Sequence, residues 1–476
     1  MTINGLNIDN ILLNAQNALK NDTSMSPSMR SMFEMLIMII GLLVSRMGLN
    51  SKNSSKPPSQ DINRVKVPKT ETTKKPGGQL GRLGVTLLPV ENPDEVITLP
   101  LNIHSLPLGD YVENGYEARQ VVELDIKARI IEYRALVFKN MEGKTFTAEF
   151  PAGVTRAIQY GSSVKACAVY LSQHQLLPYE RTAELFKNQA DIPISVGTLF
   201  NFNKEAYERL EDFEMLVKEK LKHALLLHAD ETGINIGGKK HWLHCASNAQ
   251  WTHFHPHTTR GTVAMAEAGI LPEFTGTMIH DHWKPYYTYT CLHALCNAHH
   301  IRELQWDMDN TESTWAEKMQ KLLLTIHDEV KATAQEVLEP EKSLYYRNAY
   351  REIVEEGLST MPQDPDKETN EKGKKKRGRI KHSKEHNLLI RLRDYENDIL
   401  RFMDVSYVPF TNNRGENDIR MTKVQQKISG CFQSLEGAQI FCRVRSYLLT
   451  AQKHGISASE ALKILFSGKL PSEFYA

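Results

Sequence analysis

The order of apolar runs between residues 224 and 306 restricts the fold of this chain more than any other part of its sequence. LLLHADETGINIGG predicts a strand that ends near Asp230, followed by a turn at two glycines. KKHWLHCASN and WTHFHPHT predict two more strands, and residues 260–270 predict a helix. A fourth strand over 276–280 and a long helix over 285–307 complete the order βββαβα.

This order of elements opens a ribonuclease-H-like α/β fold, in which the first and fourth strands lie side by side. Their pairing would bring Asp230 close to Asp281, which follows the fourth strand in GTMIHDHWKPYY. A third acidic residue, Glu416 in TNNRGENDIRM, stands at the start of a predicted helix. Three carboxylates at one point can hold two divalent cations, which activate a water or hydroxyl and stabilise the leaving oxygen of a phosphodiester. The residues therefore indicate metal-dependent phosphoryl transfer on nucleic acid.

Each acidic residue also has an ordinary structural explanation. An aspartate at a strand end is commonly a helix cap or turn residue, and a glutamate at a helix start complements the helix dipole. Asp418 and Glu436 compete with Glu416 for the third position, and spacing does not exclude Asp418.

Eleven histidines between residues 228 and 300 raise the question of zinc. Alternation in a β-meander scatters them over both faces, and the sequence contains no HExxH motif. Carboxylates suit magnesium better, so we expect two Mg²⁺ or Mn²⁺ ions and no zinc.

The composition indicates a folded protein of the cytoplasm. With 476 residues, 41% apolar and 24% charged, the chain is long enough for roughly two to four domains. Its six cysteines form no CxxC pair, which suits reduced thiols. The longest apolar run, Met35 to Val44, has ten residues and is too short to span a bilayer. We therefore expect a cytoplasmic protein without a membrane segment.

Changes in composition and periodicity divide the chain into seven segments. These are an N-terminal helical segment (1–48), a flexible basic arm (49–89), a small β-rich module (90–154), a helical, helix-turn-helix-like region (155–222), the first part of the core (223–310), a helical insertion with a basic loop (311–405), and the last part of the core with C-terminal helices (406–476). The N-terminal helices could self-associate or pack on their own domain. The helix-turn-helix pattern, with a second helix capped by Ser195, could place Thr198 and Asn201 against DNA or be a plain packing unit.

The net charge of +1 hides two strongly basic stretches, one in the arm and one in the insertion. Such a density of charge can neutralise DNA phosphates without reading sequence, although a solvated linker has the same composition. The residues expected to bind DNA are Lys52, Lys56, Lys74, Lys75 and Arg82 in the arm, Lys374, Lys375, Lys376, Arg377 and Arg379 in the loop, and Arg420 after the third acidic motif.

Taken together, the motifs resemble those of the insertion sequence 66 family of bacterial DDE transposases, and the resemblance covers nearly the whole chain. The matching motifs, in order, are LNSKNSSKPPSQD, KKPGGQLGR, HADETG, the HD followed by paired tyrosines, CNAHHIREL and TNNRGENDIR. The resemblance implies Asp230, Asp281 and Glu416 as the catalytic triad. It also implies that Cys296 and His299, which match the family's CxxH, support the helix beside the active site.

Two features depart from the family pattern. Residues 90–154 contain no cysteine, whereas family members usually carry a cysteine-rich zinc finger there, so we interpret this stretch as a degenerate, metal-free module. The family's alanine before the catalytic glutamate is Gly415 here, and the arginine after it is Asn417.

The function that the resemblance implies is that of a DNA transposase, which cuts transposon ends and joins them to target DNA by two-metal phosphoryl transfer. It further implies a homo-oligomer on paired ends and small accessory proteins as partners. Two other functions remain open: a transposase-derived DNA-binding protein or repressor without catalysis, and a ribonuclease-H-like nuclease that cuts without joining.

Overall fold

The computed structural model describes residues 2–3, 6–22, 24–47, 49–50, 52–54, 87–102, 106–112, 114–311, 313–361 and 382–475. Most of the basic residues expected to bind DNA lie outside these ranges, and their role stays a prediction. They are Lys56, Lys74, Lys75, Arg82, Lys374, Lys375, Lys376, Arg377 and Arg379.

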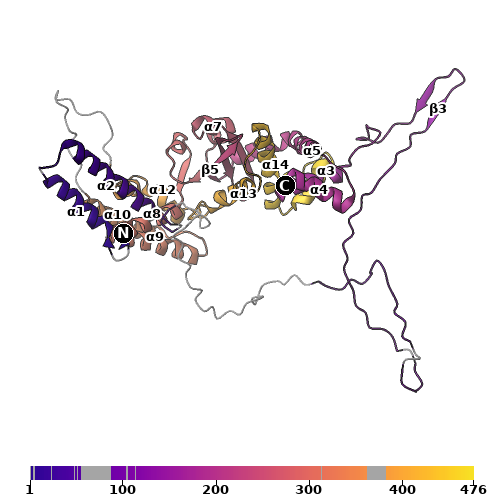
Figure 1. The fold of residues 1–476 in the computed structure, drawn as a ribbon, viewed down its shortest axis with the longest axis horizontal. Coiled ribbons are helices and arrows are strands. Elements are labelled where there is room, and N and C mark those ends of the chain that lie inside the picture. Colours follow the sequence, from indigo (N-terminus) through magenta and orange to yellow (C-terminus); the bar gives the residue numbers. More distant parts are fainter. Residues whose placement is uncertain are drawn as a thin grey trace.

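A five-stranded mixed sheet occupies the centre of the folded part (Figure 1). Its strands are β5 (Leu226–Ile236), β6 (Lys239–Ser247), β7 (Thr252–His257), β8 (Thr277–His280) and β9 (Leu292–Leu295), and their order across the sheet is β7-β6-β5-β8-β9. The first three strands run antiparallel, and β8 pairs with β5 in parallel, with His228 opposite Ile279. The predicted adjacency of the first and fourth strands is therefore present.

The β5–β6 turn is a two-residue hairpin. Gly237 and Gly238 both have positive φ angles, 56° and 81°, which this type of turn requires and glycine adopts without strain. The turn sets the register that places Asp230 opposite Cys245.

The strand β9 corrects the sequence prediction of one long helix over residues 285–307. In its place the chain forms a 3-10 helix, η5 (Lys284–Thr288), then β9, then α8 (Asn297–Asn310). The run LHAL is too short to show a period, and its pairing in parallel with β8 decides its conformation.

Helices cover both faces of the sheet. The helices before it are α3 (Ser162–Val169), the π-helical η3 (Tyr170–His174), α4 (Tyr179–Ala190), α5 (Val196–Arg209) and α6 (Glu211–Lys222). Within and after it lie α7 (Thr262–Ala268), η4 (Leu271–Glu273), α13 (Asn413–Ser429), α14 (Leu435–Lys453), α15 (Ala458–Phe466) and η6 (Ser472–Tyr475). Leu227 and Ala229 of β5 are buried in a core built with α5, α6, α14 and α15, whereas α13 packs on the face that carries Ile234.

The helix-turn-helix pattern corresponds to α4 and α5. Asp191 ends α4 in a left-handed conformation, and the Ser195 side chain caps α5 by accepting a hydrogen bond from the Thr198 backbone N–H at 3.1 Å. The apolar face of α5 lies in the main core, while Asn201 is exposed. Contact of this helix with DNA stays a prediction.

The insertion between α8 and α13 has a core built around Trp315 and Tyr350, which continues into the sheet through Ile279 and Leu295. It consists of α9 (Thr314–Ala332), α10 (Pro340–Ser359), α11 (Lys384–Asp394) and α12 (Glu396–Asp404). The sequence predicted one continuous helical stretch where α9 and α10 form and another where α11 and α12 form. Each is divided, because Glu336 has a positive φ and Tyr395 leaves helical geometry.

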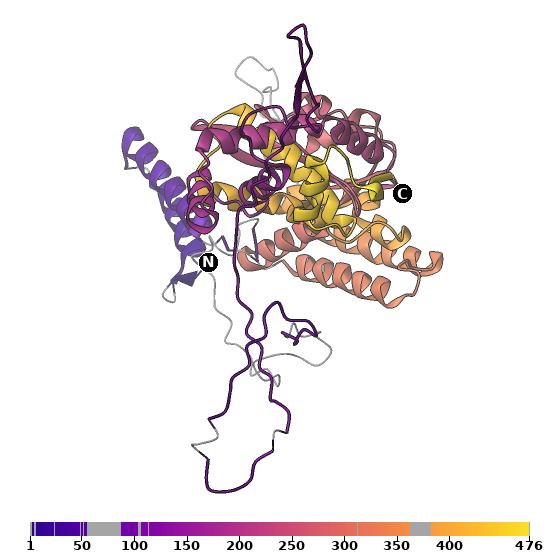
Figure 2. The same ribbon diagram turned by 90° about the vertical axis from the view of Figure 1, so that its right-hand side faces the viewer.

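Residues 90–154 differ from the β-rich module predicted for them. The described part of this range contains one hairpin, β3 (Val137–Lys139) with β4 (Thr145–Thr147), and its side chains are almost all exposed. Figures 1 and 2 show the segment reaching away from the folded core. Alternation predicts a strand only where a second layer covers the apolar face, and none of the described residues forms such a layer here.

The N-terminal segment forms a short hairpin, β1 (Thr2–Ile3) with β2 (Leu6–Asn7), then α1 (Ile8–Asn21) and α2 (Pro27–Met47), which pack together. The apolar side chains of α2 are mostly exposed. Its first 18 residues, Pro27–Val44, are long and apolar enough to cross a membrane, judged by length and composition alone. The shorter run from Met35 to Val44, taken by itself, predicts no membrane segment. Signal sequences and helices that pack on other protein share this property.

We expect Gly276→Ala to lower the free energy of unfolding by about 1–3 kcal/mol, because an added Cβ would lie 2.7 Å from the Leu225 carbonyl oxygen and push β8 away from β5. Gly197→Ala is the matched control: its Cβ would meet only Ser195 Oγ, at 3.9 Å, and should raise stability by up to about 1 kcal/mol. Urea unfolding of both variants measures the difference, and equal stabilities would contradict the packing described for β8.

Candidate active site

The parallel pairing of β5 with β8 brings two of the three predicted acidic residues to neighbouring strands. Asp230 lies within β5, and Asp281 follows the last residue of β8. The Asp281 carboxylate accepts a hydrogen bond from the Trp283 backbone N–H at 3.0 Å. His282 between them has a φ of 67°, an uncommon conformation for a residue with a side chain, and its ring packs on Tyr395 at 4.4 Å between centroids. This tight turn fixes the position of Asp281.

The third acidic residue, Glu416, lies in the first turn of α13 and is positioned through Asn412. The buried Asn412 amide donates from Nδ2 to the Ala229 carbonyl oxygen of β5 at 2.9 Å, and its Oδ1 lies 2.8 Å from His228 Nδ1. Burial lowers the pKa of His228 to about 4, so the neutral ring donates this hydrogen bond. The Asn412 backbone N–H donates to Cys296 Sγ at 3.1 Å. One residue thus joins the start of α13 to β5 and to α8.

Gly415 allows this anchor to pack closely. An added Cβ there would lie 3.2 Å from Asn412 Oδ1 and 3.5 Å from His228 Cβ. The glycine that departs from the family pattern therefore leaves room for the asparagine side chain that holds α13.

Three neighbouring carboxylates act through their charges on the carboxyl group of Asp230. Burial and the neighbouring carboxylates Glu231, Asp281 and Glu416 raise the pKa of Asp230 well above its usual range. A group of like charges that raises a carboxyl pKa in this way provides a natural place for a cation. Glu416 Oε1 is buried without a hydrogen-bond partner, and the nearest ion pair that it forms is with Arg302 Nη2 at 4.0 Å.

The two competing acidic residues are engaged elsewhere. Asp418 accepts from Lys453 Nζ at 2.7 Å and from Thr252 Oγ1 at 3.3 Å, which ties α13 to β7 and α14. Glu436 pairs with Lys204 at 2.8 Å on the surface. Glu416 is therefore the acid of these three whose charge acts on Asp230, and its own ion pair, with Arg302 at 4.0 Å, is the longest of the three.

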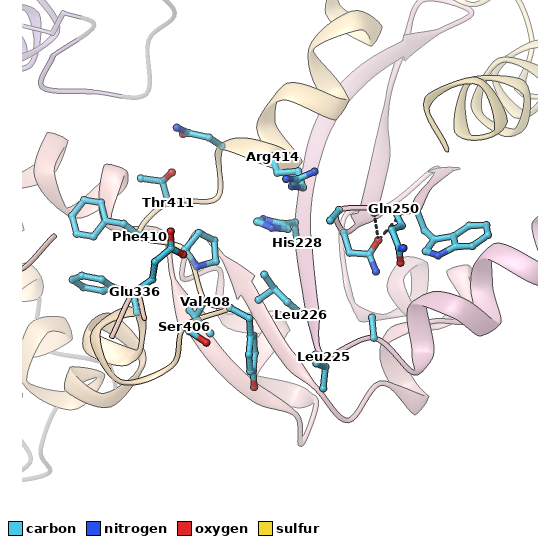
Figure 3. Close-up of a pocket in the computed structure, with 18 of the residues that line it drawn as sticks. Leu225, Leu226, His228, Gln250, Glu336, Ser406, Val408, Phe410, Thr411 and Arg414 are labelled. Carbon is cyan, nitrogen blue, oxygen red and sulfur yellow. Dashed lines mark hydrogen bonds between the residues drawn. The ribbon is translucent and has the colours of Figure 1, made fainter. Parts of the chain in front are cut away.

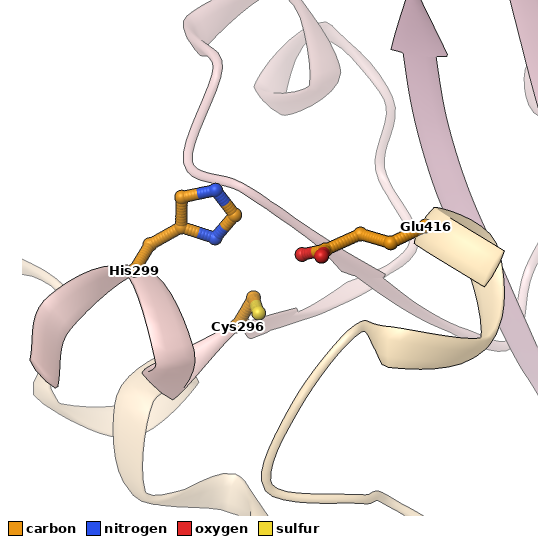
Figure 4. Close-up of side chains that lie close together, drawn as sticks. All are labelled: Cys296, His299 and Glu416. Atoms are coloured by element: carbon orange, nitrogen blue, oxygen red, sulfur yellow. The ribbon is translucent and has the colours of Figure 1, made fainter. Parts of the chain in front are cut away.

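Cys296 and His299, the predicted supporting pair, lie beside Glu416 (Figure 4). Cys296 caps the start of α8, and burial raises the pKa of its thiol to about 11. Among the described residues, the group of metal-ligand side chains whose atoms lie within 4.8 Å of one another is Cys296, His299 and Glu416. The carboxylates of Asp230, Asp281 and Glu416 are spread more widely than this.

Sequence reasoning missed Glu231, the residue after Asp230. Its buried carboxylate, on the opposite face of β5, accepts hydrogen bonds from Arg260 Nε at 2.8 Å and from the Tyr286 hydroxyl. The Arg260 guanidinium also lies over Trp283, 4.1 Å from the ring centroid. The HADETG motif and the paired tyrosines were visible in the sequence, but no local pattern links a glutamate to an arginine 29 positions later.

A groove of about 930 Å³ lies between the amino end of β5 and the helical insertion (Figure 3). Its basic lining residues are Lys220, Lys331 and Arg414, and its aromatic ones include Trp251 and Tyr407. Arg414 stands two residues before Glu416, so the groove reaches the start of α13. Arg420 of the same helix is exposed, and so is Lys52, whose neighbour Asn53 donates to Asp309 of α8 at 2.9 Å.

The fold defines a class of α/β protein with a mixed sheet, in which several acidic side chains lie near a buried aspartate. A sequence model described as "Transposase IS66 family" matches residues 157–440, which include every element of the sheet and the insertion. The chain belongs to this family of transposases, whose substrate is DNA, and the expected membership is confirmed. No curated protein matches the chain.

We expect Asn412→Ala to lower the free energy of unfolding by about 2–4 kcal/mol, because it leaves the buried Ala229 carbonyl and His228 Nδ1 without partners. Asn413→Ala is the control, since that neighbouring side chain is exposed. Chemical unfolding followed by tryptophan fluorescence measures both, and similar losses in the two variants would contradict the anchoring role.

We expect Asp230→Asn to stabilise the metal-free protein at neutral pH. The pKa of Asp230 is raised in the folded chain, so its contribution to stability is present below the usual carboxyl pKa of 3.8 and is lost as the pH rises through the folded value. The neutral amide avoids this loss. In the presence of a chelator, the variant should melt a few degrees above wild type at about pH 8, with a smaller difference at about pH 5. A variant that melts lower at about pH 8 would contradict the assigned electrostatics.

Proposed function

We propose that this chain is a DNA transposase that cuts transposon ends and joins them to target DNA through two-metal phosphoryl transfer at Asp230, Asp281 and Glu416. The observation that carries the proposal is that the pairing of β5 with β8 and the hydrogen bond of Asn412 to β5 bring Asp281 and Glu416 near the buried Asp230. The charges of these neighbours and of Glu231, together with burial, raise the pKa of Asp230. Family membership supports the same reaction class.

The topology supports a ribonuclease-H-like core. Three antiparallel strands come first, and β8 and β9 then add to the sheet in parallel on the other side of β5. The helix α13 carries the third carboxylate and packs against this central strand. Asp230 and Asp281 stand on adjacent parallel strands, and Glu416 comes from a helix more than a hundred residues later. This is an arrangement that lets three distant acids share ions.

The donor set fits hard divalent cations. The ligands are carboxylate oxygens, and Glu416 Oε1 has no hydrogen-bond partner among the described residues. The neighbouring carboxylates raise the pKa of Asp230 even though arginines pair with Glu231 and Glu416. Asp230, Asp281 and Glu416 would hold the ions. When bound, two Mg²⁺ or Mn²⁺ ions supply an activated water or 3′-hydroxyl and stabilise charge on the leaving oxygen.

The protein's own residues prepare the site before any ion arrives. The carboxylates around Asp230 favour its protonated form, whereas an ion binds its deprotonated carboxylate. Ion binding should therefore strengthen as the pH rises. Glu231, Arg260 and Tyr286 form a partly buried network behind β5 that holds the strand in place. The Asn412 hydrogen bonds hold Glu416 at a fixed distance from the strand.

The groove beside α13 is our candidate path for DNA. Lys220, Lys331 and Arg414 can neutralise phosphates, and Tyr407 offers an exposed aromatic surface at the same place. The basic arm begins next to α8, where Asn53 contacts Asp309. Lys52, Arg420 and the basic loop would add sequence-independent contacts. A homo-oligomer on paired ends and small accessory proteins belong to this proposal as partners.

A strand-transfer assay tests the function. Wild-type protein, labelled DNA that carries the inverted repeats flanking its own gene, and Mg²⁺ or Mn²⁺ should give joined products. Asp230→Asn should reduce joining at least about 100-fold, because the ions lose a shared ligand, while end binding is kept. Glu436→Gln, which changes a surface acid, should join at the wild-type rate.

The other outcomes separate the alternatives. Cleavage without joining would favour a ribonuclease-H-like nuclease. End binding without metal-dependent cleavage would favour a DNA-binding protein derived from a transposase. Joining by Asp230→Asn at the wild-type rate would overturn the assignment of the site.

A further inference from the structure

A thiol, an imidazole and a carboxylate meet beside the proposed catalytic site. Cys296 lies at the start of α8, His299 in its first turn, and Glu416 in the first turn of α13 (Figure 4). Their ligand atoms all lie within 4.8 Å of one another. In Figure 4 the Glu416 carboxylate points towards the His299 ring and the Cys296 side chain.

The mixture of atoms selects the kind of ion. Sulfur and imidazole nitrogen are poor ligands for Mg²⁺ but are the usual ligands of Zn²⁺, with a carboxylate oxygen as a common third. Zinc bonds of about 2.0–2.3 Å in tetrahedral geometry separate ligand atoms by roughly 3.5 Å. The three side chains would therefore close by about 1 Å, which rotation of the glutamate can supply, and a water would complete the tetrahedron.

Hydrogen bonding in the cluster leaves ligand atoms free and orients the sulfur. His299 Nδ1 and Glu416 Oε1 are buried and have no hydrogen-bond partner in the part of the chain that the structure describes. Cys296 Sγ accepts the Asn412 backbone N–H at 3.1 Å, the kind of contact that stabilises a metal-bound thiolate. Arg302 Nη2 lies 4.0 Å from Glu416 Oε1, and its partly exposed side chain can turn to solvent as an ion enters.

We propose that Cys296, His299 and Glu416 form a Zn²⁺ site, and that zinc bound there withdraws Glu416 from the catalytic carboxylates and so inhibits the reaction. The binding of zinc depends only on these three residues. The inhibition rests on the proposed function, because it requires Glu416 to serve Mg²⁺ or Mn²⁺ when zinc is absent. The sequence predicted no zinc here because a CxxH supplies only two ligands. The third ligand, Glu416, comes from α13, which follows the insertion in the chain.

Metal binding to the full-length, reduced protein tests the site without any activity. Zn²⁺ affinity is measured by competition with a chromophoric chelator, and Co²⁺ is used as a spectroscopic probe of sulfur ligation. Wild type should bind Zn²⁺ and give a sulfur-to-cobalt charge-transfer band in the near ultraviolet. Cys296→Ser should lose the band, and Cys296→Ser and His299→Gln should each bind Zn²⁺ at least about tenfold more weakly.

Two variants provide controls for other thiols and histidines. Cys167→Ser changes an exposed cysteine and His223→Gln an exposed histidine, and both should keep the wild-type affinity and band. Circular dichroism verifies folding, and if Cys296→Ser does not fold, His299→Gln decides. Equal Zn²⁺ affinity in wild type and His299→Gln, or a cobalt band that persists in folded Cys296→Ser, would overturn the site.

The inhibitory consequence is tested separately in the strand-transfer reaction. With Mg²⁺ present, Zn²⁺ at concentrations that fill the site should suppress joining by wild type, and a zinc-selective chelator should restore it. Unchanged joining at a zinc-filled site would overturn the inhibition. A wild-type protein that never joins DNA would instead contradict the proposed function, and the binding measurements would still decide whether the zinc site exists.

Discussion

The position of the third carboxylate depends on the hydrogen bonds of one buried asparagine. Asn412 donates to the Ala229 carbonyl, accepts from His228 and donates through its backbone to Cys296, so it touches β5 and α8 at the point where α13 begins. Glu416 follows one turn later. Because the insertion separates α13 from the rest of the core in sequence, this contact is what holds the acid beside Asp230 and the Cys296–His299 pair.

The site gathers negative charges whose repulsion destabilises the metal-free fold. Burial and three neighbouring carboxylates act on Asp230, while the two arginines in reach pair with two of those neighbours, Arg260 with Glu231 and Arg302 with Glu416. A fold that cancelled this charge internally would be more stable and would bind cations less well. The same arrangement thus explains both a stability penalty without metal and an affinity for cations.

Sequence patterns predicted the parts of the fold that local periodicity determines. The three-stranded meander, the fourth strand before Asp281, the helix pair capped at Ser195 and the helix carrying Glu416 all appear. The first strand, β5, was predicted to end near Asp230 but continues to Ile236, because β6 pairs with it as far as Lys239. The prediction failed where tertiary contacts decide: β9 is a strand because β8 pairs with it, and residues 90–154 lack the covering layer that their alternation suggested. Asn412, Glu231 and the proximity of Cys296 to Glu416 arise between residues far apart in the chain, so no local spacing contains them.

The most direct measurement of the central claim is anomalous diffraction from crystals of the protein soaked in Mn²⁺. The account predicts two manganese peaks roughly 3.5–4 Å apart, with Asp230 in contact with both and Asp281 and Glu416 each on one. Peaks that avoid Asp230, or no bound manganese at these carboxylates, would contradict it.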